Sequence, residues 1–292
     1  MAADQPRRAT SDPAPSRLYS AQRSRVSRPH ISALPRLLWL PVIAGALLLL
    51  LPLISLVLQA DLASVPQALS SPTTRDALAL SFQTATAATV ICLICGVPLG
   101  VLLARRRWRV LDWVRPLVLL PLVLPPVVAG VALLAAFGRM GLAGQPLHAL
   151  GIQITFTGVA VVLAQAFVAM PFMVISVESA VGALDREYEE AAATMGAGPG
   201  ATLWWVVLPL VRPGLVAGGV LCFARCLGEF GATLAFAGSA AGSTRTAPVE
   251  VYLLQQSDPQ AAAALAVVMI AVALAVVGLV YGPGRRWFSP PL

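Results

Sequence analysis

The sequence contains no lysine, so each of its 20 Lys or Arg residues is an arginine. An ATP-binding P-loop of the GxxxxGK[ST] type needs a lysine to reach the phosphates, and this chain therefore cannot carry one. Histidine is nearly absent too: only His30 and His148 occur, and there is no HExxH or GxSxG pattern. An intramembrane enzyme would need such a nucleophile, base or metal-ligand set. These absences argue against an enzyme and against a built-in ATPase.

Charge of either sign is scarce. Charged residues make up 11% of the chain and apolar residues 58%, whereas about a quarter of the residues of a soluble domain are charged. This balance is typical of a polytopic helical membrane protein surrounded by lipid. The net charge of +7 could suggest a nucleic-acid partner. The arginines, however, flank apolar runs rather than forming one basic face, so no nucleic-acid partner is expected.

The four cysteines form two pairs, Cys92 with Cys95 and Cys222 with Cys226, each at helical spacing inside an apolar run. The CxxC pattern at 92–95 has no second ligand pair and no histidine near it. We interpret the cysteines as packing residues and expect no disulfide, metal or cofactor in this chain.

Long apolar runs predict six membrane-spanning helices. The first has 22 residues, which at about 1.5 Å per residue is enough to cross a bilayer core of about 30 Å. Pro121, Pro125 and Pro126 predict a kink in the third. An Arg-, Ser- and Pro-rich disordered tail is expected before the spans and a short tail after them. The predicted order is tail 1–36, spans at about 37–58, 78–104, 116–137, 157–181, 214–237 and 261–281, and tail 283–292.

The arginines predict the orientation of these spans. Sixteen of the 20 lie on one side, Arg225 lies within the fifth span, and only Arg75, Arg139 and Arg245 lie on the other side. Because positive charge is concentrated on the cytoplasmic side of membrane proteins, both termini and the loop 182–213 are predicted to be cytoplasmic. The expected location is the cytoplasmic (inner) membrane, with several passes.

The cytoplasmic loop 182–213 has an internal pattern. Residues 187–195 combine helix-forming residues with acidic side chains in the first turn, where they suit the positive end of a helix. Gly196 and Gly198 should end this helix. A second short segment, 201–207, then leads to Leu208-Pro209 and back into the membrane.

This spacing resembles the EAA loop of ABC-importer permeases. The chain has Glu-Ala-Ala at 190–192, then three residues and Gly196, then nine residues and Val206, followed by Leu208-Pro209, with Val where the family has Ile. The resemblance implies a type I ABC importer (MetI-like) permease fold, all-α with six transmembrane helices, over residues 37–282. It also implies that the loop docks on a separate cytoplasmic ATPase subunit, which binds ATP and Mg. The coupling residues implied are Glu187, Glu190, Ala191, Ala192, Gly196, Val206, Leu208 and Pro209.

Three further stretches resemble the molybdate-type permeases and their sulfate relatives: 120–144, 156–174 and LGEFGATLAFAGS at 227–239. The resemblance implies ATP-driven import of molybdate, with sulfate, thiosulfate or tungstate as alternatives. A passive anion channel is the rival from another class, but a channel has no ATPase to dock. The external loops, of about 20 residues, are too short for a folded binding domain. The implied partners are therefore an extracytoplasmic oxyanion-binding protein, the ATPase and a second copy of the chain in a homodimer.

Two charges lie inside the fifth predicted span. Arg225 and Glu229 are four residues apart and should share a helix face, which Thr233 would continue. Charges near mid-bilayer usually face a partner or a wet cavity. Two hypotheses follow: the face lines the translocation path, where Arg225 attracts an oxyanion, or the two charges form a structural ion pair.

Overall fold

The computed structural model describes residues 38–105 and 109–281, and within these ranges the chain forms helices and no strands. The predictions for the two tails, for His30 and for arginines 106 and 107 lie outside the described residues. The described residues divide after Pro52 into two units. Helix α1 (Trp39–Gln59) starts in the first unit and ends in the second. It is strongly apolar, contains Pro52, and none of its residues is buried.

The second unit begins with η3 (Leu62–Ser64) and α2 (Val65–Ser70). A long apolar segment follows, made of α3 (Pro72–Ile91), a π-helical turn η4 (Cys92–Gly96) and α4 (Val97–Arg105). Together they form a 34-residue segment, longer than the predicted range 78–104. Such π-helical turns inside α-helices are often found at functional sites.

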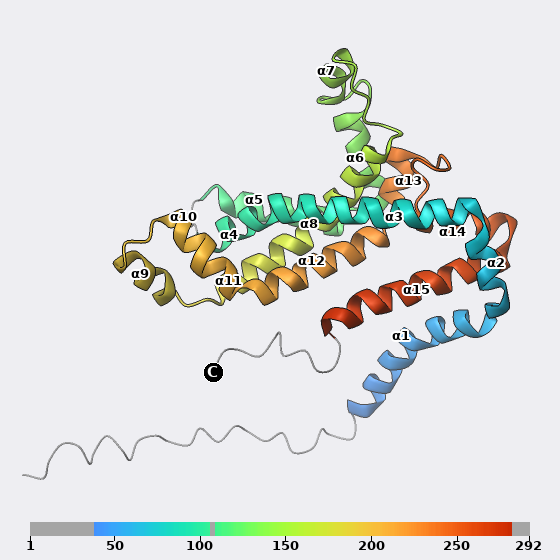
Figure 1. Cartoon of the computed structure of the whole chain (residues 1–292), viewed down its shortest axis with the longest axis horizontal. Helices are drawn as coiled ribbons and strands as arrows, with labels where there is room; N and C mark the ends of the chain where they lie inside the picture. Colours follow the sequence, from blue (N-terminus) through green and yellow to red (C-terminus); the bar gives the residue numbers. More distant parts are fainter. Residues whose placement is uncertain (1–37, 106–108, 282–292) are drawn as a thin grey trace, which may run out of the picture. The chain divides into compact units, whose positions relative to one another are not determined.

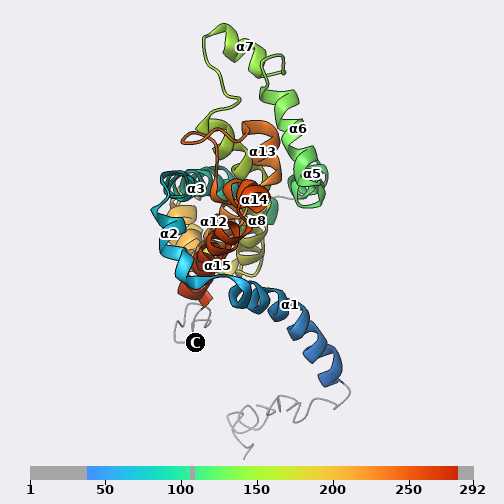
Figure 2. The ribbon, with the colours of Figure 1, turned by 90° about the vertical axis from the view of Figure 1, so that its right-hand side faces the viewer.

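The kink predicted from the prolines is confirmed and is larger than a simple bend. Helices α5 (Leu111–Val123) and α6 (Pro126–Phe137) meet at an angle of 120°. Pro125 and Pro126 lack backbone N–H groups, so the helical hydrogen-bond ladder cannot run through them. Figure 2 views α5 nearly along its axis and shows α6 leaving it toward the short helix α7 (Gly144–Ala149).

Helix α8 (Gly158–Gly182) is at the centre of the second unit. The hydroxyl of Thr157 accepts a hydrogen bond from the N–H of Ala160 and so caps its first turn. Its buried side chains are mainly Ala and Val, and small residues of this kind let neighbouring helices approach closely. It packs against α3, α4, α5, α12 and α13.

After α8 the chain forms a loop, then α12 packs along α8, and α15 (Pro259–Tyr281) packs on α12. The loop predicted to be cytoplasmic consists of α9 (Glu187–Thr194), α10 (Pro199–Thr202), a π-helical turn η5 (Leu203–Val207) and α11 (Leu208–Leu210). Then come α12 (Arg212–Leu227), α13 (Gly231–Ala237), α14 (Ala247–Ser257) and α15 (Pro259–Tyr281). In Figure 1, α3, α8, α12 and α15 run alongside one another, with α9 and α10 at one end of this bundle and α14 at the other.

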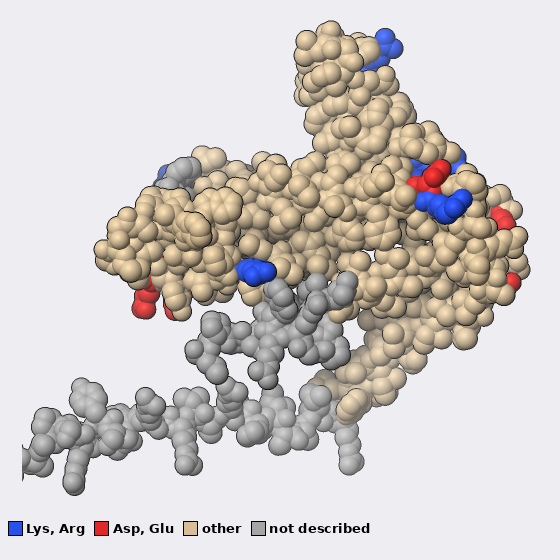
Figure 3. Space-filling model, viewed as in Figure 1, with Lys and Arg blue, Asp and Glu red and all other residues tan. Residues whose placement is uncertain are grey.

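Four helical segments in the described ranges are long and apolar enough to cross a membrane, and there are six if each sharply bent pair counts as one span. One such pair is α5 with α6. The other joins α10–α11 to α12 with a 73° bend. On the face seen in Figure 3, the few charged side chains lie mainly toward the ends of the bundle, as a lipid-facing surface requires.

Candidate functional site

The loop between α8 and α12 presents α9 with one face packed and the other open. Ala192 is buried, whereas Glu187, Glu190 and Ala191 are exposed. The three acidic side chains of the first turn lie at the positive end of the helix dipole, which they stabilise. The open face therefore combines carboxylates with small alanines, and a partner protein could approach its backbone closely.

Gly196 ends α9 in a left-handed conformation, with φ of +86°. The N–H of Gly196 donates to the carbonyl of Ala193 at 2.9 Å, and the N–H of Ala197 donates to that of Ala192 at 3.0 Å. This is the Schellman pattern of a helix C-terminus, which favours glycine because a Cβ is disfavoured at positive φ. The structure thus gives a conformational reason for glycine at this position of the motif.

The second half of the loop carries an exposed aromatic surface that the motif does not mention. Trp204 and Trp205 are exposed, Trp205 to 82%, and with Gly200 and Ala201 they line a hollow of about 420 Å³. The motif residues Val206 and Leu208 are half-buried, and Pro209 is exposed. Sequence reasoning named the second helix of the loop but missed these two tryptophans as candidate contact residues.

Arg105, the last residue of α4, ties α9 to the helical bundle. Its Nη2 lies 2.5 Å from Oε1 of Glu189 and also donates to the carbonyl of Leu184 at 3.3 Å. Arg105 and Glu189 border a hollow between α4 and the loop. From the sequence, Arg105 was only one of the arginines predicted to be cytoplasmic. Its partners could not be predicted, because they lie about 80 residues away in the chain and leave no local pattern.

The intramembrane pair is present, but not on one continuous helix. Nη1 of Arg225 lies 2.7 Å from Oε2 of Glu229. Helix α12 ends at Leu227, so the predicted uninterrupted helix 214–237 is wrong. Glu229 lies in the break, and its Oε1 accepts a hydrogen bond from the N–H of Ala232 at 2.9 Å, in the first turn of α13.

The break changes what these residues can do. Thr233 lies on α13 and is fully buried, so it does not continue an exposed face with Arg225 as expected. Glu229 is only 1% exposed, whereas the side chain of Arg225 is 29% exposed. In this pair, the buried carboxylate of Glu229 caps α13, and the guanidinium of Arg225 in front of it reaches the surface of this chain.

Three of the four cysteines lie against α8. Cys92, Cys222 and Cys226 are buried and donate to backbone carbonyls of α8, at 3.6, 3.2 and 3.7 Å. Cys95 is exposed. All four thiols are free, and the described residues contain no group of three or more His, Cys, Asp or Glu side chains suited to a metal ion.

Solved structures of distant sequence share the fold. A bacterial ABC transporter involved in alginate import superposes with a TM-score of 0.61 at 18% identity, covering 83% of this chain and 92% of that one. The MetNI methionine ABC transporter gives a TM-score of 0.54 at 20% identity, covering 71% and 90%.

Sequence relatives are considerably closer. The molybdenum transport system permease protein ModB of Mycobacterium tuberculosis is 52% identical over 253 residues, which cover 87% of this chain and 95% of the relative. ModB of Escherichia coli K12 is 38% identical over 205 residues, covering 70% and 90%. The family model for the binding-protein-dependent transport system inner membrane component matches residues 96–290. This chain therefore belongs to the family of inner-membrane permease components of binding-protein-dependent ABC transport systems.

Proposed function

We propose that this chain is the membrane-spanning permease subunit of an ATP-driven importer that carries molybdate across the cytoplasmic membrane. The observation that carries the proposal is the 52% identity to a molybdenum permease over 95% of that relative's length. The chain itself contributes no hydrolytic chemistry. ATP and Mg would be bound by a separate cytoplasmic ATPase subunit, because a chain without lysine lacks the P-loop residue that contacts the phosphates.

The proposed coupling element is α9 with the turn that follows it. Glu187, Glu190 and Ala191 offer an exposed face to the ATPase, while buried Ala192 holds the helix against its neighbours. When ATP binding closes the ATPase subunits, α9 would be displaced as a rigid unit whose end is defined by Gly196. Val206, Leu208 and Pro209 would carry this displacement into α12.

A second copy of the chain is proposed to complete the translocation path. Helix α1 and the outer faces of α5 and α6 expose many large apolar side chains, which lipid or a second permease subunit would cover. Across such a homodimer, the two Arg225 guanidinium groups could attract an oxyanion in transit. The competing role for Arg225 is structural, as the counter-ion of Glu229.

The direct test is reconstitution of the chain with its ATPase in lipid vesicles that also receive the binding protein. Radiolabelled molybdate should accumulate inside only with ATP and with the binding protein. Equilibration without ATP would identify a passive anion channel. ATP-dependent uptake of sulfate but not of molybdate would keep the mechanism and replace the substrate.

A further inference from the structure

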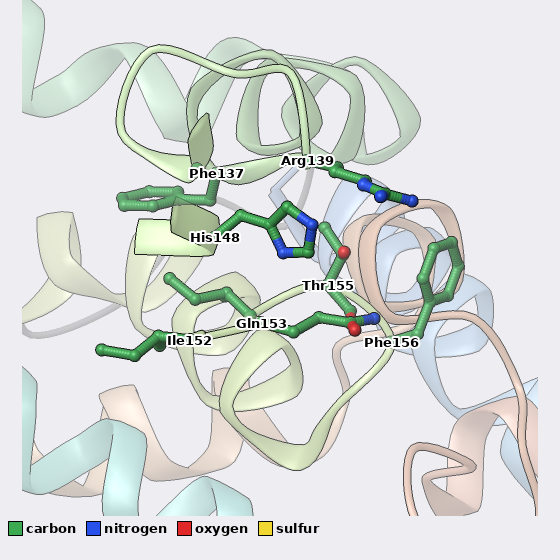
Figure 4. Close-up of a pocket in the computed structure, with 9 residues that line it drawn as sticks. Phe137, Arg139, His148, Ile152, Gln153, Thr155 and Phe156 are labelled. Atoms are coloured by element: carbon green, nitrogen blue, oxygen red, sulfur yellow. The ribbon is translucent and has the colours of Figure 1, made fainter. Parts of the chain in front are cut away.

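A pocket of about 250 Å³ lies in the lobe that joins α6 to α8. Its walls come from the end of α6, from α7 and from the extended segment before α8. Figure 4 shows the side chains of Arg139, His148, Gln153 and Thr155 around the same space, with Phe156 at its edge. The distribution of arginines predicts that this lobe lies on the external side of the membrane.

The charge of the pocket has one sign. Arg139 and His148 line it with the amide of Gln153, and no carboxylate is among its lining residues. The sequence has no Asp or Glu at all from residue 113 to residue 177. None of the four ion pairs found in the described ranges involves Arg139. A planar guanidinium with five donors is suited to hold a carboxylate through two parallel hydrogen bonds.

Exposed apolar side chains lie on the same lobe. Met140 is 84% exposed and Leu142 is 93% exposed, and Leu150 and Phe156 are exposed as well. Methionine, aromatic residues and arginine are the residue types enriched where proteins contact one another. A cationic pocket with such neighbours fits a protein segment that presents a carboxylate and brings apolar surface with it.

Phe156 connects the pocket to the intramembrane part of the chain. It has a φ of +60°, which is rare for a bulky residue and is stored strain that the surroundings must hold. Its ring packs on Gly238, where a Cβ would lie 3.2 Å from Cδ1 of the ring. Gly238 directly follows α13, and the other end of α13 is capped by Glu229.

We propose that this pocket docks a carboxylate-bearing segment of the extracytoplasmic binding protein, with Arg139 and His148 as its contacts. The inference rests on the proposed function, because it assigns a site to one partner of that importer. Charge complementarity supports this occupant: an acid-free lobe that exposes a guanidinium without an ion-pair partner favours a protein that brings its own carboxylates. Docking there would displace Phe156 and, through its ring, Gly238 at the end of α13.

The test measures binding of the purified binding protein to the full permease–ATPase complex in nanodiscs. We expect Arg139→Gln to raise the dissociation constant about tenfold and to weaken its dependence on salt. Arg139→Lys, which keeps the charge but loses the planar fork, should have a smaller effect, and His148→Gln should lie between Arg139→Lys and Arg139→Gln. Arg75→Gln is the matched control, since it removes an exposed arginine predicted on the same side outside the pocket.

A photo-reactive amino acid at Leu142 identifies the occupant directly. The expected product is a cross-link to the binding protein that disappears in the Arg139→Gln variant. A cross-link only to lipid or to a second copy of the chain would overturn the inference, as would unchanged affinity of Arg139→Gln. If the binding protein does not bind the wild-type complex at all, the proposed function itself fails. If the binding protein binds the wild-type complex and the Arg139→Gln variant with the same affinity, only the proposed role of the pocket is refuted.

Discussion

Gly196 shows how one residue of a sequence motif acquires a physical role. Its positive φ and the two hydrogen bonds to Ala192 and Ala193 end α9 at a defined point. Open space surrounds the position where a Cβ would lie, so a substitution is opposed by backbone conformation and not by a clash. A helix that must transmit a displacement benefits from a fixed end.

We predict that Gly196→Val leaves membrane insertion intact and lowers uptake. A side chain in the left-handed region costs about 1–2 kcal/mol, or roughly a 5- to 30-fold shift away from the native turn. Gly196→Asn should be milder, since Asn tolerates this region best after glycine. Insertion is checked in the membrane fraction and transport by uptake. Gly182→Val, at an open position without positive φ, is the control, and wild-type uptake by Gly196→Val would refute the prediction.

The structural role and the transport role of Arg225 can be distinguished by comparing a single variant with a double variant that also neutralises Glu229. Arg225→Gln leaves a carboxylate that is 1% exposed without its counter-ion. The stability of the folded permease should therefore fall, by less than the about 3–5 kcal/mol of a fully buried broken pair, because Arg225 is partly exposed. Arg225→Gln with Glu229→Gln should regain most of it, as measured by thermal unfolding in detergent.

The double variant also tests the path hypothesis. It is expected to assemble, so its uptake reports on the charge of Arg225 and not on folding. Reduced uptake supports a guanidinium that attracts the oxyanion in transit. Uptake at the wild-type level would leave Arg225 with its structural role alone.

At the scale of elements, α9 is held by α4 as well as by the helices that directly flank it in the chain. The ion pair between Arg105 and Glu189 joins the end of α4 to the first turn of α9. A displacement of α9 would therefore also pull on the long segment α3–η4–α4, which packs along α8.

We expect Arg105→Gln or Glu189→Gln to weaken the stimulation of ATP hydrolysis by loaded binding protein, several-fold, with less effect on basal hydrolysis. The exchange of both charges, Arg105→Glu with Glu189→Arg, should recover part of the stimulation. Asp185→Asn removes an exposed acid from the same loop and serves as the control. Equal losses in the single variants and in the charge-exchanged pair would show that the ion pair is not the connection.

The sequence was most informative where the signal was local. Apolar length predicted the helical membrane class, and the proline cluster predicted the kink that the structure shows between α5 and α6. The break between α12 and α13 was missed because no proline marks it and apolar residues resume directly after Glu229. The Arg105–Glu189 pair and the hydrogen bonds from three cysteines to backbone carbonyls of α8 could not be predicted, since these partners meet only after packing.

At the scale of the whole molecule, the chain is one part of a machine. It has helices long enough to span a membrane, a loop that we propose docks on an ATPase and a lobe that we propose docks on a binding protein, and its relatives are molybdenum permeases. Molybdate, tungstate and sulfate are all tetrahedral dianions, so they differ little in the shape and charge that the chain would have to accommodate. Selection among them is therefore expected in the binding protein.

The most direct measurement is oxyanion uptake by cells that lack this chain, with molybdate, tungstate and sulfate supplied singly at low concentration. The prediction is loss of molybdate uptake, alone or with tungstate, restored by the wild-type chain and not by Gly196→Val. Loss of sulfate uptake with molybdate uptake intact would contradict the substrate assignment.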